Sequence, residues 1–120
     1  MSWIVLFHEE FDAEFSAFRS DVQTALLAKA RLLESFGPQL GRPHVDTLKD
    51  SKHANMKELR FFDASDGVWR VAFAFDTHRQ AVLLVAGDKS GGSEKRFYRS
   101  LIATADKRLD GHLAQQKKGD

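Results

Sequence analysis

The sequence predicts an α+β fold in which a small, mainly antiparallel sheet packs on an N-terminal helical hairpin and is followed by a C-terminal helix. Two patterns carry this prediction. Residues 56–62, 69–76 and 81–86 are aromatic or apolar runs separated by turn residues, which is typical of neighbouring strands. Residues 9–36 and 93–113 instead repeat apolar residues at helical spacing. The helices are expected to cover the apolar face of the sheet.

Length and composition restrict the class of protein. A chain of 120 residues with 42% hydrophobic residues is large enough for one core, so we expect a single domain over residues 1–120 with a frayed tail from about residue 115. Cysteine is absent, which excludes disulfides and thiolate metal sites. The formal net charge of +1 is far from that of a general nucleic-acid coat protein, so any contact with nucleic acid must be local.

The sequence also lacks recognisable targeting signals. The apolar run at residues 2–7 is too short for a signal peptide and has no basic flank. No stretch is apolar over the length that a transmembrane helix needs. We therefore expect a soluble, cytoplasmic protein with no membrane partner.

The N-terminal part is predicted to be a strand followed by helix. Residues 3–7 are an apolar run, and from Glu9 onward apolar residues recur at helical spacing, with acidic residues in the first turn. Ser20 opens a capping-box sequence, so the helix can break and restart there. The result is a helical hairpin or one bent helix, ended by Gly37 and Pro38.

The segments on either side of the three main strands are less regular. Residues 44–49 are a possible short strand or extended arm, and residues 50–55 form a polar loop that we expect to be mobile. After the last strand, Ser93 is a suitable N-cap for the C-terminal helix, whose apolar stripe runs from Tyr98 to Leu113.

The two predicted hairpins place three cations on one face of the sheet. A first turn centred near residue 65 sets Arg60 opposite Arg70, and side-chain alternation gives them the same face. A second turn centred between residues 78 and 79 sets Gly87 opposite Arg70, with Lys89 diagonal to it. Three cations on one face require an anionic partner.

The remaining residues of both faces follow from the same register. The cationic face also holds small or charged residues, so we expect it to be shallow and open; they are Glu58, Ala72, Ala74, Val85 and Gly87. The opposite face is predicted to be the core; it holds Leu59, Phe61, Trp69, Val71, Phe73, Phe75, Val82, Leu84 and Ala86.

Several segments together resemble the HigB branch of the RelE/ParE toxin superfamily, which is often described as phage-derived host-addiction proteins. These segments are residues 36–43, 56–61, 69–73, 82–89, 96–98 and 105–106. The resemblance implies the RelE/ParE-like fold and the toxin of a type II toxin–antitoxin pair, neutralised by a HigA-like helix-turn-helix antitoxin encoded beside it. Characterised relatives cleave messenger RNA, typically on the ribosome. The family's strand arginines match Arg60 and Arg70, and its basic residue after the last strand matches Lys89.

Metal-free RNA cleavage explains why such cations would be needed. The 2′-hydroxyl must lose a proton, extra negative charge must be stabilised, and the departing 5′-oxygen must gain a proton. We predict that Arg60 and Arg70 grip the scissile phosphate and that Lys89 stabilises charge or acts as the acid. The alternative is that these cations only form ion pairs, with Glu58, Asp76 or Asp88 as the candidates.

Two further residues are candidates for the same site. Glu58 could act as a base, although neighbouring arginines favour an orienting salt bridge because they would lower its pKa. Tyr98 could stack on a base or take part in proton transfer, or it could simply pack in the core.

Basic residues around this face could follow an RNA backbone. Lys57, Lys95 and Arg96 are the predicted RNA-binding residues, and the other basic side chains in the same regions are Lys49, Lys52 and Arg99. The alternative is a scatter of ordinary surface cations. His8, His44 and His78 have no metal-ligand spacing, so we predict no metal and no cofactor.

The predicted function is therefore a metal-independent messenger RNA endoribonuclease that inhibits translation. A ParE-like toxin that binds and poisons DNA gyrase is the main alternative, and a catalytically inactive relative kept for partner binding is a third. The fold alone does not separate them. The oligomeric state is left open.

Overall fold

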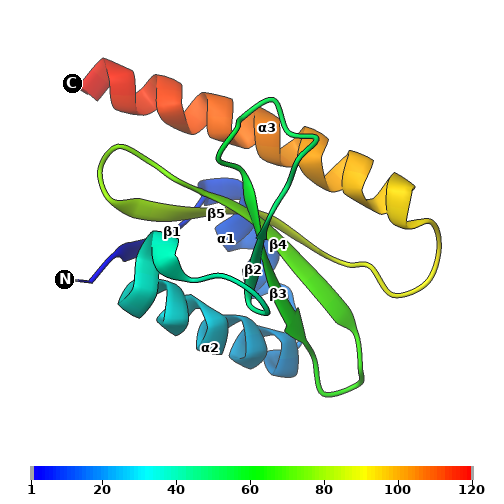
Figure 1. Cartoon of the computed structure of the whole chain (residues 1–120). Helices are drawn as coiled ribbons and strands as arrows, with labels where there is room; N and C mark the ends of the chain where they lie inside the picture. The colour runs from blue at the N-terminus through cyan, green and yellow to red at the C-terminus, as the bar shows by residue number, and fades with distance from the viewer. Residues whose placement is uncertain (1, 120) are drawn as a thin grey trace.

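The computed structural model describes residues 2–119 and has three layers (Figure 1). A five-stranded sheet lies in the middle, with helices α1 and α2 on one face and helix α3 along the other. The strands are β1 (Ile4–Phe7), β2 (Val45–Thr47), β3 (Lys57–Phe62), β4 (Val68–Phe75) and β5 (Gln80–Asp88). The helices are α1 (Glu9–Ser16), α2 (Ser20–Phe36), the short 3-10 helix η1 (Gly37–Gln39) and α3 (Glu94–Gly119). The predicted α+β class is confirmed.

The strands follow the order β1-β5-β4-β3-β2. Strands β2 to β5 pair antiparallel with their neighbours along the chain, as the hairpin patterns predict. Strand β1 pairs parallel with β5, with Val5 opposite Ala81. These are the first and the last strand along the chain, so no local turn signal indicates that they pair.

The register around the arginines is as predicted. Arg60 lies opposite Arg70, and Arg70 lies opposite Gly87. Asp63 stabilises the first turn, because one of its carboxylate oxygens accepts hydrogen bonds from the backbone N–H of Ser65 and Gly67. The Asp-Gly turn and the strand alternation were therefore sufficient to pair β3 with β4.

A β-bulge makes the predicted register of β5 wrong over its first half. The register shifts between Ala72 and Phe73, so that Phe73 lies opposite Leu83. One residue of shift exchanges the two faces of a strand. Val82 and Leu84, expected in the core beneath the N-terminal helices, instead lie beneath α3.

The face expected to be shallow and open is covered by α3 over half its length. Ala72 and Ala74 are completely buried there. They form a second apolar core with residues of α3, namely Leu101, Ile102, Ala105 and Leu109. Only the end of this face that carries Arg60 and Arg70 lies beyond the apolar stripe of α3, which restricts the functional surface to one end of the sheet.

The first core lies between the sheet and the N-terminal helices. It is rich in aromatic residues and includes Phe11, Leu26, Leu59, Phe61 and Phe73, all almost fully buried. Of the two N-terminal arrangements left open, two separate helices are observed. Helix α1 begins after His8, whose Nδ1 accepts the backbone N–H of Glu10.

Two segments expected to be loose are held by hydrogen bonds. Residues 50–55 are attached to α3, because the Ser51 hydroxyl donates to Asp106 at 2.5 Å and His53 lies 2.8 Å from Asp110. The tail expected to fray is helical as far as Gly119, and Gln116 donates to Asp76 at 2.6 Å. Both sets of hydrogen bonds have the same cause: α3 lies along the sheet and provides partners that are distant in sequence. No helix within residues 2–119 is long and apolar enough to cross a membrane.

Candidate active site

Two strands and the last helix bring the predicted charged residues together at one end of the sheet. Glu58 and Arg60 share a face of β3, and Arg70 lies opposite Arg60 on β4. Tyr98, in the second turn of α3, reaches Glu58 from above the sheet. We call Glu58, Arg60, Arg70 and Tyr98 the Glu58 cluster.

Glu58 is the centre of this cluster and is only 3% exposed. Its Oε2 accepts hydrogen bonds from Arg60 Nε at 3.0 Å and Nη2 at 2.8 Å. Its Oε1 accepts the Tyr98 hydroxyl at 2.6 Å and lies 3.6 Å from Arg70 Nε. A buried carboxylate with these partners is suited to holding both arginines and the phenol in place.

The two arginines have different environments. Arg60 remains about a third exposed, and its Nη2 also donates to Asp46 at 3.3 Å. The hydrogen bonds to Glu58 raise the pKa of Arg60 further, so its charge is permanent. Arg70 is 8% exposed, and its Nη1 donates to the Trp69 carbonyl at 2.9 Å. Arg60 is therefore accessible to solvent, whereas Arg70 lies mostly below the surface.

Lys89 lies just beyond the cluster, after the end of β5. Its ammonium donates to Glu94 at 2.9 Å and lies 5.7 Å from the centre of the Tyr98 ring. The exposed Glu94 carboxylate is a partner that a ligand phosphate can replace. Lys89 thus lies near the same ring whose hydroxyl donates to Glu58.

The Tyr98 phenol keeps its proton strongly. Burial, reinforced by the hydrogen bond to the Glu58 carboxylate, raises the pKa of Tyr98 to about 12. The hydroxyl is therefore a proton donor near neutral pH. The packing expected for Tyr98 is observed, since its ring packs beside the second core, and its hydroxyl also belongs to the charged cluster.

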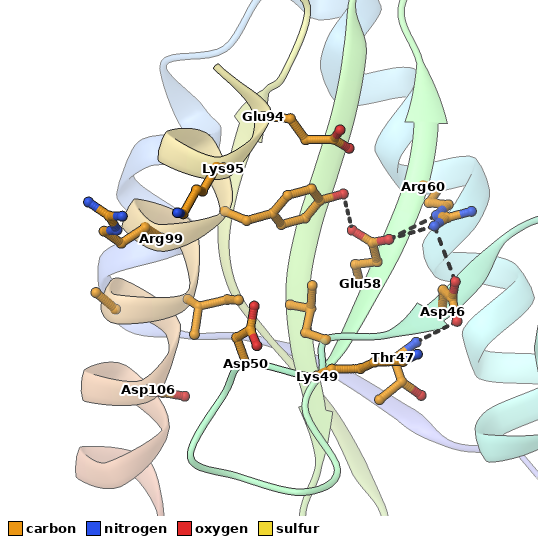
Figure 2. Close-up of a pocket in the computed structure, with 14 residues that line it drawn as sticks. Asp46, Thr47, Lys49, Asp50, Glu58, Arg60, Glu94, Lys95, Arg99 and Asp106 are labelled. Atoms are coloured by element: carbon orange, nitrogen blue, oxygen red, sulfur yellow. Dashed lines mark hydrogen bonds and ion pairs between the residues drawn. The ribbon is translucent and has the colours of Figure 1, made fainter. Parts of the chain in front are cut away.

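A groove of about 680 Å³ runs between β2, β3 and α3 and contains most of these groups. Figure 2 shows Glu58 and Arg60 on its floor beside Asp46, with Glu94, Lys95 and Arg99 on the α3 side. Four basic and five acidic side chains line it, and Arg60 is ion-paired with Glu58 and Asp46. An anionic ligand that contacts Arg60 must compete with these two carboxylates.

The predicted RNA-binding residues are placed unequally around this groove. Lys95 lines it, whereas Arg96 is exposed on α3 outside its lining. Lys57 lies on the opposite face of β3 from Glu58, by strand alternation. Lys49 and Arg99 also line the groove.

Asp46 was not predicted as a residue of the site, and the packing role of Gly87 was not predicted either. Asp46 accepts hydrogen bonds from Arg60 and from Arg42, whose Nη2 lies at 2.8 Å. Gly87 allows α3 to approach the sheet, because a Cβ there would lie 2.8 Å from the Phe97 ring. The neighbouring Tyr98 depends on this close approach. The sequence predicted the glycine opposite Arg70 and the C-terminal helix, but it did not show that this helix covers the glycine.

Within residues 2–119, no group of three or more His, Asp or Glu side chains is placed to hold a metal ion. The groups that meet in the Glu58 cluster and beside it are cations, a carboxylate and a phenol. Such a set can bind an anion, stabilise developing negative charge and supply a proton.

Residues 13–110 match the family described as phage derived protein Gp49-like (DUF891). The chain belongs to this Gp49-like family. The match covers most of the chain, including the whole Glu58 cluster and Lys89.

Two Mycobacterium tuberculosis (strain ATCC 25618 / H37Rv) relatives of this Gp49-like protein are candidate toxins. HigB3 is 45% identical over 105 residues, which cover 88% of this chain and 89% of HigB3. HigB2 is 39% identical over 107 residues, or 89% of this chain, which spans about half of HigB2 (53%). These relatives confirm the resemblance to the HigB branch that the sequence motifs indicate.

A solved structure shares the fold of the Gp49-like chain. A mutant of the E. coli toxin RelE in the free state aligns with a TM-score of 0.60, over 86% of this chain and 96% of RelE. The sequence identity is 13%, so this likeness concerns the fold alone. It confirms the RelE-like architecture predicted from the sequence.

Proposed function

We propose that this protein is the toxin of a type II toxin–antitoxin pair and that it inhibits translation by cutting messenger RNA on the ribosome without a metal ion. Residues 1–120 form a single toxin domain that acts in the cytoplasm, where ribosomes are found. The observation that carries the proposal is the Glu58 cluster, in which a buried carboxylate holds Arg60 and the Tyr98 hydroxyl at the floor of a groove. The similarity to HigB3 and HigB2 supports the toxin class.

Charge stabilisation is the task that the cluster performs best. As the 2′-hydroxyl gives its proton to solvent water, the 2′-oxygen attacks phosphorus and the bond to the 5′-oxygen breaks, negative charge grows on the phosphate oxygens. Arg60 binds these oxygens through its exposed guanidinium, and Arg70 adds a second positive charge from beneath. Lys89 leaves Glu94 and contacts the same phosphate. Preorganised donors of this kind each contribute on the order of a hundredfold or more in rate.

Tyr98 is the proposed proton donor for the departing 5′-oxygen. A phenol with a pKa of about 12 is fully protonated near neutral pH, and a departing alkoxide is a still stronger base. Glu58 orients the phenol and Arg60 and is not itself the base, because it is buried and occupied by these partners. This is the orienting role that the sequence favoured for Glu58.

Lys95 and Arg99 on α3 and Lys49 beside β2 would contact the RNA backbone on either side of the cleaved phosphate. Their side chains are exposed, so they contribute affinity that depends on salt rather than on RNA sequence. Arg96, outside the groove lining, would contribute only over a longer distance, and Lys57 lies on the other face.

The proposed partner is a helix-turn-helix antitoxin of the HigA type, encoded beside the toxin gene. To neutralise directly, it must cover or distort the groove, and an acidic segment could compete with RNA for Arg60 and Lys89. We expect the two proteins to co-purify from the two-gene operon, with weaker binding at high salt. Failure to co-purify at low salt would count against a direct antitoxin.

The test of the nuclease proposal is a ribosome-dependent cleavage assay with mapped RNA ends. The wild-type protein should cut ribosome-bound message, and the Arg60→Ala, Arg70→Ala double variant should not. Circular dichroism must show that the double variant is folded. Full cleavage by a folded double variant would refute the site. Intact transcripts and accumulated double-strand DNA breaks after induction would instead indicate a gyrase poison.

A further inference from the structure

A second groove, of about 570 Å³, lies on the other side of Arg60, between α2 and the outer edge of β3. Arg60 lines both grooves, so the two are adjacent at this residue. The walls of the second groove are small or apolar and include Ala25, Ala28 and Pro43. We call this the α2 groove.

The charge of the α2 groove differs from that of the first groove. Lys29, Arg60 and Arg70 line it, and none of its lining residues is acidic. Lys29 contacts His44 Nδ1 at 2.8 Å and forms no ion pair with a carboxylate within residues 2–119. The α2 groove therefore holds Lys29 without a carboxylate partner among residues 2–119, beside Arg60 and Arg70, whose partner Glu58 lies in the first groove.

An exposed aromatic ring stands at the edge of this groove. Phe62 is 66% exposed, the highest value among the exposed large hydrophobic residues described for the chain. It lies two residues after Arg60 on β3, so both side chains are on the same face about 7 Å apart along the strand. Burying this ring against a ligand would be favourable, and its position on a strand of the sheet holds it in place.

We propose that the α2 groove binds the single-stranded RNA next to the cleaved phosphate, with a nucleobase stacked on Phe62 and the backbone phosphates near Lys29 and Arg60. This inference rests on the proposed function and adds the path of the RNA. A flat apolar ring alternating with an anion is the chemistry of a single-stranded nucleic acid, and exposed aromatic residues beside cations are the usual way to bind one.

The arrangement also predicts limited sequence preference. Every base has a π face, so stacking on Phe62 accepts all of them. None of the small or apolar walls formed by Ala25, Ala28 and Pro43 offers a side-chain hydrogen bond to a base edge. The α2 groove therefore contributes affinity and position, and the choice of cleavage site comes from elsewhere.

The test measures the affinity of the full-length protein for a short, fluorescently labelled single-stranded RNA in the absence of ribosomes. Phe62→Ala should weaken binding by roughly tenfold, and Phe62→Tyr, which keeps the ring, should bind like the wild type. Lys29→Gln should weaken binding and lower the slope of log affinity against log salt by about one. Phe36→Ala is the matched control, because Phe36 is also exposed but lies at the far end of α2, outside the groove.

Each outcome decides the inference separately from the proposed function. All variants should keep the wild-type unfolding temperature, since Phe62 and Phe36 are exposed. The inference is wrong if folded Phe62→Ala binds RNA with wild-type affinity, or if the wild-type protein binds no RNA. The nuclease proposal is tested separately, by the ribosome-dependent cleavage assay. If Phe62→Ala instead weakens binding of an acidic antitoxin peptide and leaves RNA affinity unchanged, the groove is a protein-binding surface and the inference is wrong.

Discussion

The Tyr98 hydroxyl donates a 2.6 Å hydrogen bond to Oε1 of Glu58, which joins α3 to β3 across forty residues of sequence. The same carboxylate holds Arg60 through its other oxygen. The position of the last helix and the position of the central arginine therefore depend on one buried group. Substitutions in this cluster are expected to separate catalytic effects from structural ones.

Tyr98→Phe should lower cleavage strongly while leaving the fold intact. The substitution keeps the ring packed against the second core, and it removes only the hydroxyl that is the proposed proton donor. We expect cleavage to fall by roughly a hundredfold or more. Single-turnover cleavage on programmed ribosomes measures this, with Ser100→Ala on the exposed side of α3 as the control. Wild-type cleavage by Tyr98→Phe would show that the hydroxyl is not the acid.

The ionisation of Tyr98 should depend on Glu58. Burial and the Glu58 carboxylate raise the pKa of Tyr98 from an ordinary 10.0 to about 12. In Glu58→Gln we expect the pKa to fall part of the way towards 10, since burial remains. Phenolate absorbance during an alkaline titration measures both values, and the Tyr98→Phe difference spectrum isolates this phenol as the only tyrosine in the chain.

The same shift makes a prediction about stability at high pH. Between about 10 and about 12 the unfolded chain has lost the Tyr98 proton and the folded protein still holds it. The contribution of Tyr98 to the free energy of unfolding should therefore be constant below pH 10. It should fall as the pH rises from about 10 to about 12. Denaturant unfolding at several alkaline pH values tests it, and Tyr98→Phe should show a shallower decline.

Arg70→Ala and Lys89→Ala should both reduce cleavage but differ in stability. Arg70 is buried beside Glu58, and its loss should lower the free energy of unfolding by roughly 1–3 kcal/mol. Lys89 pairs with an exposed carboxylate, so its removal should cost about 1 kcal/mol or less. Urea unfolding of both variants makes the comparison. Equal losses of stability would show that Arg70 is not a buried partner of Glu58.

Asp63→Asn should destabilise the turn that sets the register of the two arginines. Asp63 accepts the Trp69 indole N–H at 2.8 Å and the backbone N–H groups of Ser65 and Gly67. These hydrogen bonds, led by that of Trp69, lower the pKa of Asp63 below its ordinary 3.8. Its stabilising contribution is therefore complete above pH 3.8 and is lost as the pH falls through the lowered value.

Thermal unfolding over a range of acidic pH tests this prediction. Asp63→Asn should have a lower unfolding temperature near neutral pH and a smaller further loss on acidification than the wild type. Asp12→Asn, at an exposed carboxylate of α1, is the control for the change of charge. An unchanged unfolding temperature in Asp63→Asn would show that the turn holds without this carboxylate.

The pairing of Arg60 with Arg70 could be predicted from sequence because it depends on local information. A turn with an Asp-Gly pair joins two strands whose aromatic residues alternate, and any slip of one residue would expose the ring of Phe73 or the side chain of Leu59. The helical segments were predictable for the same reason. Apolar spacing is a property of each segment by itself.

Tertiary structure alone decided which face is open and which groups meet. The bulge between Ala72 and Phe73 exchanged the two faces of the first half of β5 relative to the predicted register. Helix α3 covers the resulting apolar patch of Ala72, Ala74, Val82 and Leu84. The parallel pairing of β1 with β5 likewise has no local signal. The meeting of Tyr98 with Glu58 follows from that covering helix. The physical reason is that burial of an apolar face depends on everything packed against it, and this includes segments that are far away in the sequence.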